Sequence, residues 1–171
     1  MKKFIGVLVL IFLFGALNAQ IQKTINLRFG DSESKGLAGI EFVLSKVSIA
    51  GGWRPAWMPA PADKAIHSFD VALTVYTNEW YESSFYISLA RASKSIIYVS
   101  KIDANTGEDT YKVEPSVIFQ VGRRFNFKDM SPELNSKFSL DAGIGANFGN
   151  HATLFAFEFI LNYSLGRRHY K

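Results

Sequence analysis

Apolar and polar residues alternate along most of the chain, which is the period of a β-strand whose two faces meet different surroundings. The last such segment carries Phe155, Phe157, Phe159, Leu161, Tyr163 and Leu165 in a single phase. The alternation predicts eight strands, at 24–29, 39–45, 68–76, 84–90, 96–102, 116–126, 137–148 and 152–167. Beyond the first twenty residues, no segment predicts a helix of ordinary length.

Segments rich in Gly, Asn, Asp, Ser and Pro separate the predicted strands, as tight connections require. Residues 91–94 predict a turn between the fourth and fifth strands. The segment 49–65 is longer, contains three prolines and two tryptophans, and is predicted to be a loop. Proline has no N–H for a sheet ladder, so the sixth strand is predicted to start at Ser116, with Pro115 in the preceding loop.

Eight alternating strands fit either a soluble barrel or sandwich, or a membrane barrel, and the polar face discriminates between them. A face in water is usually rich in Lys, Glu and Arg, whereas the lumen of a small membrane barrel holds small and polar side chains. On the polar phase of four strands, at 68–76, 84–90, 139–147 and 156–166, small residues dominate and there is no Lys or Arg. The pattern favours an all-β, eight-stranded antiparallel up-and-down transmembrane β-barrel.

The apolar face of these strands agrees with this prediction. It carries no charged residue from 69 to 75, from 138 to 148 and from 155 to 165. A Lys or Arg at the middle of a lipid-facing surface costs about 2–4 kcal/mol, so a membrane barrel is expected to lack them there. The alternative is a soluble exported β-barrel that binds a small apolar ligand in a cavity lined by Phe and Leu.

The N-terminal segment has the layout of a cleavable secretory signal peptide. Lys2 and Lys3 precede an apolar stretch from Phe4 to Leu17, which is too short for a comfortable membrane-spanning helix, and Ala19 is a suitable last residue before cleavage. We expect a signal peptide at 1–19 and an outer-membrane β-barrel domain at 20–171. The alternative for the first segment is an uncleaved anchor.

Composition excludes several classes of function. The chain has no cysteine, so disulfides do not hold it together. The formal charge of +4 includes Lys2 and Lys3, which leaves about +2 on the mature chain and gives no basic surface for nucleic acid. The length after the signal peptide suits one domain.

The triplet Gly-Arg-Arg occurs at 122–124 and again at 166–168. Both copies follow apolar alternating runs that point in the same direction in an up-and-down barrel. We expect the glycine to let the backbone turn and the arginines to meet headgroups or water at the inner border of the bilayer. The alternative is a coincidence between two strand ends.

The whole mature chain resembles the small eight-stranded bacterial outer-membrane β-barrel proteins, in pattern rather than through a unique motif. Phe155, Phe157, Phe159 and Tyr163 resemble the terminal strand that the barrel-assembly machinery recognises in such proteins, although this chain ends in Lys171 behind Tyr170. The resemblance implies outer-membrane lipid as surroundings, contact with that machinery during biogenesis, and no cofactor.

Charged residues on the polar phase are candidates for the lumen. The acids are Glu41, Asp70, Asp141 and Glu158, and the available cations are Arg28 and Arg124. We expect a structural ion-pair network; a proton or solute path is the functional alternative. General porin activity is not expected, because an eight-stranded barrel is only just wide enough for its own side chains.

No catalytic or metal site is expected. The chain has three histidines and lacks the GxSxG and HExxH motifs and a glycine-rich phosphate loop. The predicted strand order places His67 and His169 near the inner rim and His151 near the outer rim. A lipid-modifying rim enzyme is a weaker alternative, with His67, followed by Ser68 and Asp70, as its best candidate.

Aromatic and basic residues near the predicted strand ends are candidates for the membrane interface. They are Trp53, Trp57, Trp80, Tyr81, Phe125, Phe127, Tyr163, Arg167 and Arg168. Ordinary packing is the alternative for each aromatic, and a plug or partner contact for Trp53 and Trp57, whose loop is predicted on the periplasmic side. The sequence thus predicts a non-enzymatic outer-membrane barrel with a structural, envelope-integrity or surface-interaction role.

Overall fold

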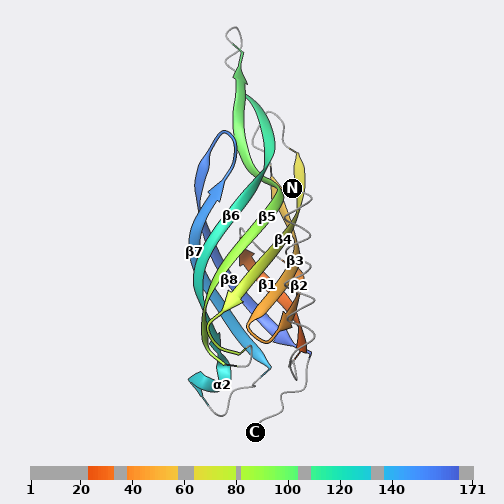
Figure 1. Ribbon diagram of the computed structural model, residues 1–171. Coiled ribbons are helices and arrows are strands. Elements are labelled where there is room, and N and C mark those ends of the chain that lie inside the picture. Colours follow the sequence, from red (N-terminus) through yellow and green to blue (C-terminus); the bar gives the residue numbers. More distant parts are fainter. Residues whose placement is uncertain are drawn as a thin grey trace, which may run out of the picture.

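Eight antiparallel strands close into a barrel in the computed structural model, which describes residues 23–32, 38–57, 64–79, 82–103, 109–131 and 137–165 (Figure 1). The strands are β1 (Lys23–Ser32), β2 (Ala38–Leu44), β3 (Val47–Trp57), β4 (Ala65–Tyr76), β5 (Ser84–Ile102), β6 (Asp109–Asn126), β7 (Phe138–Phe148) and β8 (Thr153–Ser164). A short helix, α2 (Phe127–Met130), follows β6. Within the described residues, no helix is long and apolar enough to cross a bilayer. The predicted all-β eight-stranded barrel is confirmed, while the signal peptide lies outside the described residues.

Each strand pairs with the next along the chain, and β8 pairs with β1 to close the sheet. The β2–β3, β4–β5 and β6–β7 connections lie at one end, which is the lower end in Figure 1. The start of β1 and the end of β8 lie there too, because the strands alternate in direction. The β5–β6 hairpin projects furthest at the opposite, upper end (Figure 1).

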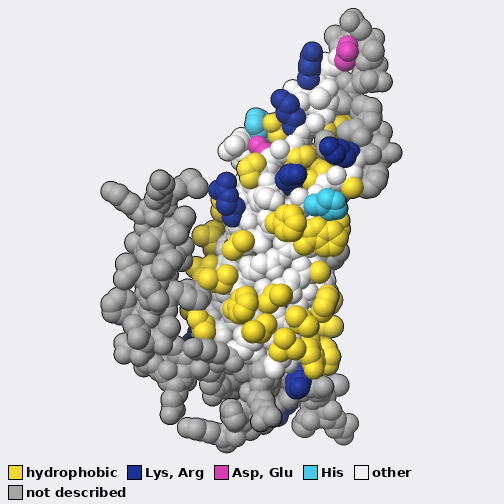
Figure 2. All heavy atoms as spheres, turned by 90° about the vertical axis from the view of Figure 1, so that its right-hand side faces the viewer, with side chains coloured by type: hydrophobic (Ala, Val, Ile, Leu, Met, Phe, Trp, Pro, Cys, Tyr) yellow, Lys and Arg dark blue, Asp and Glu magenta, His cyan; other side chains and the backbone are white. Residues whose placement is uncertain are grey.

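The exterior of the barrel is apolar and the interior is polar. Phe157 is 64% exposed and Val71 is 59% exposed, whereas Ser88 and Asn147 are fully buried. The outward apolar side chains form a band around the barrel. On β5 and β6 this band lies between the cross-strand row of Arg91 and that of Arg123, and we call the whole band the apolar belt. Figure 2 shows one side of the barrel, on which hydrophobic side chains gather and Lys, Arg and His side chains lie mostly above them. This is the reverse of a water-soluble domain, in which apolar side chains fill the core.

The predicted loop at 49–65 is wrong over its first half, which forms most of β3. Val47, Ile49 and Trp53 lie outward, while Ser48 and Ala50 are buried inside. Pro55 is tolerated because β2 pairs with β3 only as far as Trp53, so one side of Pro55 needs no ladder bond. β3 therefore ends and β4 begins at the upper end, whereas the prediction placed this segment at the end that carries the chain termini.

The predicted turn at 91–94 is wrong as well, because β5 runs unbroken from Ser84 to Ile102. Its partner β6 begins at Asp109 and contains Pro115, which was predicted to lie in a loop. Ala92 pairs with Ser116 and Ile96 pairs with Glu114, so residues 93–95 bulge opposite Pro115. A bulge leaves ladder groups unpaired, which makes room for a residue without an N–H.

Candidate functional site

A charged network fills the lower part of the interior. Arg124 contacts Asp141 through Nε at 2.6 Å and Glu41 through Nη2 at 2.8 Å. Arg28 lies 3.2 Å from Asp141 and 3.6 Å from Glu158. We call these five residues the lumen network. All five side chains are almost completely buried, so their charges must be compensated inside the barrel.

Neutral side chains add hydrogen bonds to the lumen network. Tyr76 Oη donates to Glu41 Oε1 at 2.7 Å, and its ring lies 4.5 Å from the Arg124 guanidinium carbon. Ser48 and Asn26 also donate to Glu41, at 2.6 and 2.8 Å. Several donors to one carboxylate satisfy the lone pairs that a buried, unpaired carboxylate would leave uncompensated.

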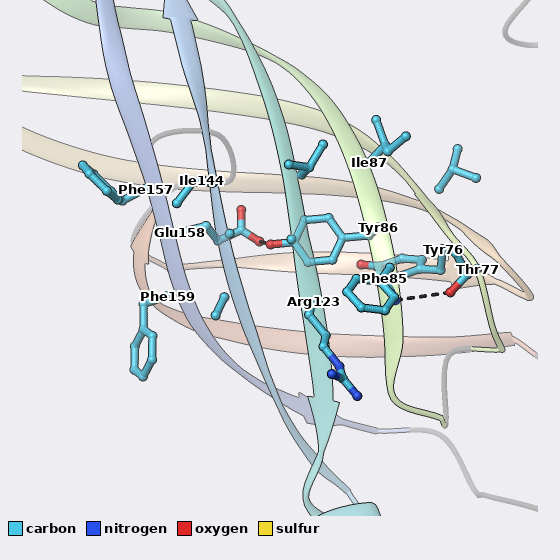
Figure 3. A pocket seen from close by; sticks show the side chains of 15 residues that line it. Tyr76, Thr77, Phe85, Tyr86, Ile87, Arg123, Ile144, Phe157, Glu158 and Phe159 are labelled. Carbon is cyan, nitrogen blue, oxygen red and sulfur yellow. Dashed lines mark hydrogen bonds between the residues drawn. The ribbon is translucent and has the colours of Figure 1, made fainter.

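Tyr86 on β5 joins the lumen network through a hydrogen bond to Glu158 on β8. It stands in one cross-strand row with Gly122, Gly143 and Glu158, which lie on β6, β7 and β8. A Cβ at Gly143 would come within 2.5 Å of Tyr86 Oη, and one at Gly122 would collide with the same ring. The ring therefore lies across both glycines, and Oη donates to Glu158 at 2.9 Å (Figure 3). Gly122 provides this space within β6 and forms no turn, contrary to the prediction.

A separate polar cluster lies higher in the interior. Asp70 accepts from Ser68 Oγ at 2.6 Å and lies 3.6 Å from Arg54 Nε. Asp70 was predicted in one network with the other acids, but it forms an ion pair with Arg54, a cation that the prediction did not include. Arg54 was missed because β3 was interpreted as a loop, although its even number matches the inward phase of Ser48 and Ala50.

At the upper end, Glu114 holds the β7–β8 connection against β6. Its Oε1 accepts from the His151 backbone N–H at 3.0 Å, and Oε2 lies 2.7 Å from His151 Nδ1. The imidazole stacks on Tyr98 with ring centroids 4.2 Å apart. Hydrogen bonding by His151 lowers the pKa of Glu114, with burial opposing the shift. The pair lies where β5 and β6 extend past β4 and β7.

Acid should loosen this contact. A carboxyl whose pKa is depressed on folding stabilises the fold above its unfolded pKa of about 4.3, and the contribution is lost as the pH falls through the folded value. We expect the protection factors of the amides at 149–152, which are corrected for intrinsic exchange at each pH, to fall below about pH 4. Glu114→Gln should make these protection factors low already at neutral pH and remove their pH dependence, whereas Glu82→Gln in the exposed β4–β5 connection should leave both unchanged. Equal exchange in wild type and Glu114→Gln across this range would contradict the assignment.

The structure separates the residues of the predicted rim enzyme. His67 is exposed on the outer surface and stacks on Trp53 at 5.7 Å, whereas Ser68 and Asp70 face the interior. His67 also lies at the upper end, whereas the prediction placed it at the end that carries the chain termini. His151 was predicted at the end opposite the termini and lies there, and His169 is outside the described residues. Among the described residues, no group of His, Cys, Asp or Glu is placed to hold a metal ion.

The Gly-Arg-Arg prediction is wrong for the second arginine of the first copy. Arg123 is exposed near the lower end of β6, but Arg124 points into the lumen and is fully buried. Among the interface candidates, Trp53 is 38% exposed near the upper end, and Phe125, Phe127 and Tyr163 are half-buried. The side chains of Trp57, Trp80, Tyr81, Arg167 and Arg168 lie outside the described part of the chain, as does the second triplet.

A groove of about 920 Å³ crosses the outer surface from β4 to β8. We call it the lateral groove; residues of the row that contains Tyr86 and Glu158 line it between two rows of outward side chains (Figure 3). The neighbouring row toward the upper end is Val75, Ile87, Val121, Ile144 and Phe157. The row toward the lower end contains Phe85, Arg123, Ala142 and Phe159. Both walls are apolar except for Arg123 and Thr77.

Comparison with known proteins finds a similar solved structure. No protein-family model and no curated protein matches the chain. The chain is similar to the Yersinia pestis outer membrane protein Ail, whose backbone structure is known in a phospholipid bilayer nanodisc. The two share 11% sequence identity and a TM-score of 0.46, and the match covers 84% of this chain and 100% of that chain.

Proposed function

We propose that the chain is a non-enzymatic outer-membrane β-barrel with a structural, envelope-integrity or surface-interaction role. The observation that carries the proposal is the inverted distribution of side chains, with Phe, Ile, Val and Leu outside and buried ions inside. Backbone groups in hydrocarbon must all be paired, and a closed sheet achieves this. The lower end, with the strand termini, would face the periplasm.

The interior supports a closed rather than a conducting barrel. Arg28, Arg124 and Asp141 fill the lumen at 0–1% exposure, held to one another by ion pairs. The exterior disfavours the soluble alternative. That alternative requires Phe and Leu around a central ligand cavity, whereas Phe69, Phe155 and Phe157 are exposed on the outside.

The β5–β6 hairpin supports a surface role. Past Ala92 and Val117 the two strands pair only with each other, and they carry exposed Val99 and Ile102 beyond the apolar belt. A hairpin that projects this far from the barrel would stand in the external medium, where it could meet other surfaces (Figure 1).

Fractionation with a matched pair of variants tests the membrane assignment. We expect wild-type protein in the detergent-soluble membrane fraction, with a shift on unboiled gels that disappears on heating. Phe119 lies within the apolar belt, so Phe119→Lys should destabilise the inserted barrel by about 2–4 kcal/mol and reduce its yield in the membrane fraction. Thr110 lies on the same strand above the belt, so Thr110→Lys should assemble normally. A monomer soluble without detergent, made more soluble by Phe119→Lys, would overturn the proposal.

A further inference from the structure

We propose that the lateral groove is a binding site for an anionic glycerophospholipid of the inner leaflet, with an acyl chain in the groove and the lipid phosphate on Arg123. This inference rests on the proposed function, because it requires the outer surface of the barrel to face lipid. It assigns a ligand to the outer face of the barrel, whereas the side chains of the lumen network point inward.

The shape of the groove suits a single hydrocarbon chain. Its walls are parallel cross-strand rows in which Phe85 and Ile87 stand on one side of β6 and Ile144, Phe157 and Phe159 on the other (Figure 3). Ala142, the small outward residue of β7, leaves the space between them open. Its volume of about 920 Å³ lies within the range of about 300–1,000 Å³ typical of ligand pockets.

The direction of the groove suits a lipid in a bilayer. Strands of such barrels tilt by about 35–45° from the barrel axis, so a row perpendicular to them is inclined to the membrane plane by the same angle. A chain in the groove would therefore rise from headgroup level into the hydrocarbon.

Arg123 supplies the charge that selects the headgroup. Its guanidinium carbon lies 5.1 Å from the Phe85 ring centroid and 5.0 Å from that of Phe125, and no described carboxylate pairs with it. The side chain extends toward the lower end of the barrel (Figure 3). An arginine on a lipid-facing surface extends to the interface, where phosphates lie, and its planar fork matches a phosphate. The two rings hold this fork beside the groove.

The chain offers a matched control for each half of the site. Arg91 is the other outward arginine bordering the apolar belt, on β5 near the upper end and outside the groove. Ala146 is another outward alanine of β7, and it too lies outside the groove. Changes at these positions alter charge or bulk on the same surface without touching the proposed site.

The test is lipid retention measured by native mass spectrometry. The full protein is extracted from membranes, reconstituted in vesicles of equal phosphatidylglycerol and phosphatidylcholine, and released in a mild detergent. We expect wild type to retain phosphatidylglycerol in preference by about fivefold, which corresponds to about 1 kcal/mol. Arg123→Gln should abolish the preference, and Arg91→Gln should leave it unchanged. Arg123→Lys should keep part of it, because the charge remains but the planar fork is lost. Ala142→Phe should reduce retention of both lipids severalfold, and Ala146→Phe should not.

Other outcomes would count either against the lipid site or against the proposed function. Protein that inserts normally but shows no preference, or an Ala142→Phe variant that retains as much lipid as Ala146→Phe, would overturn the inference alone. A dimer that Ala142→Phe dissociates would also overturn it, because the groove would then hold a second copy of the chain. Failure of the wild-type protein to insert into vesicles would instead count against the proposed function.

Discussion

Replacing Arg124 with Met should destabilise the barrel by about 3–5 kcal/mol, the range measured when one partner of a buried ion pair is removed. Arg124 is fully buried and pairs with both Glu41 and Asp141. Met fills much of the space but leaves two carboxylates short of a cation. The midpoint of guanidinium unfolding, followed by the heat-modifiable band of the reconstituted protein, measures the loss.

Arg123→Met is the matched control, because Arg123 precedes Arg124 on the same strand but points outward. We expect it to unfold close to the wild-type midpoint, since an exposed side chain has little desolvation to recover. Unfolding of Arg124→Met at the same midpoint as Arg123→Met would show that the lumen network contributes nothing to stability.

A compensated variant separates charge from packing. In the triple variant Arg124→Met, Glu41→Gln and Asp141→Asn, the buried charges are removed together, and part of the stability should return. Recovery should be incomplete because Asp141 also pairs with Arg28, which then loses a carboxylate. A triple variant no more stable than Arg124→Met would indicate that shape, rather than charge, holds this region together.

The number of strands was predicted correctly through two errors that cancel. One strand was missed at Val47–Trp57, and one strand, Ser84–Ile102, was divided in two. Gly51 and Gly52 interrupt the alternation in β3, and Pro55 argues against a strand unless its ladder side is known to be free. That freedom is set by how far β2 extends along β3, which is a property of the assembled sheet. The position of His67 follows the same error.

The sequence could predict which side chains of the lumen network point into the barrel. An even or odd position fixes whether a side chain points inward, so Arg28, Glu41, Asp141 and Glu158 could be assigned to the interior from the alternation alone. The choice between lipid and water outside depended on the small, uncharged residues of the inward phase, a signal available without coordinates.

The pairing of these residues could not be predicted. Glu41 and Arg124 stand on strands β2 and β6, which are not neighbours in the sheet and meet only across the lumen. Such contacts depend on the stagger of the closed barrel, which alternation does not specify. Tyr86 shows a partial signal, because a large aromatic on an inward phase of small residues needs glycines opposite it, and Gly122 and Gly143 supply them.

Gly143→Ala should destabilise the barrel by about 1–3 kcal/mol, the usual cost of overpacking a filled interior. The new Cβ would lie 2.5 Å from Tyr86 Oη and 3.1 Å from the Val121 carbonyl oxygen. Tyr86 can yield only by leaving Glu158, whose carboxylate would then lose a buried hydroxyl donor. Guanidinium unfolding of the reconstituted barrel measures the change.

Gly51→Ala and Tyr86→Phe show whether the tyrosine is the cause. A Cβ at Gly51 meets nothing within 4 Å, so Gly51→Ala should be neutral or stabilise by up to about 1 kcal/mol, the gain from replacing glycine within a strand. Tyr86→Phe removes Oη, so adding Gly143→Ala to that background should cost less than in wild type, with a coupling of about 1 kcal/mol. The residual cost reports the contact with the Val121 carbonyl. If Gly143→Ala behaved like Gly51→Ala, the ring would not lie across the two glycines, and its contact with Glu158 would have to arise from another packing of the lumen.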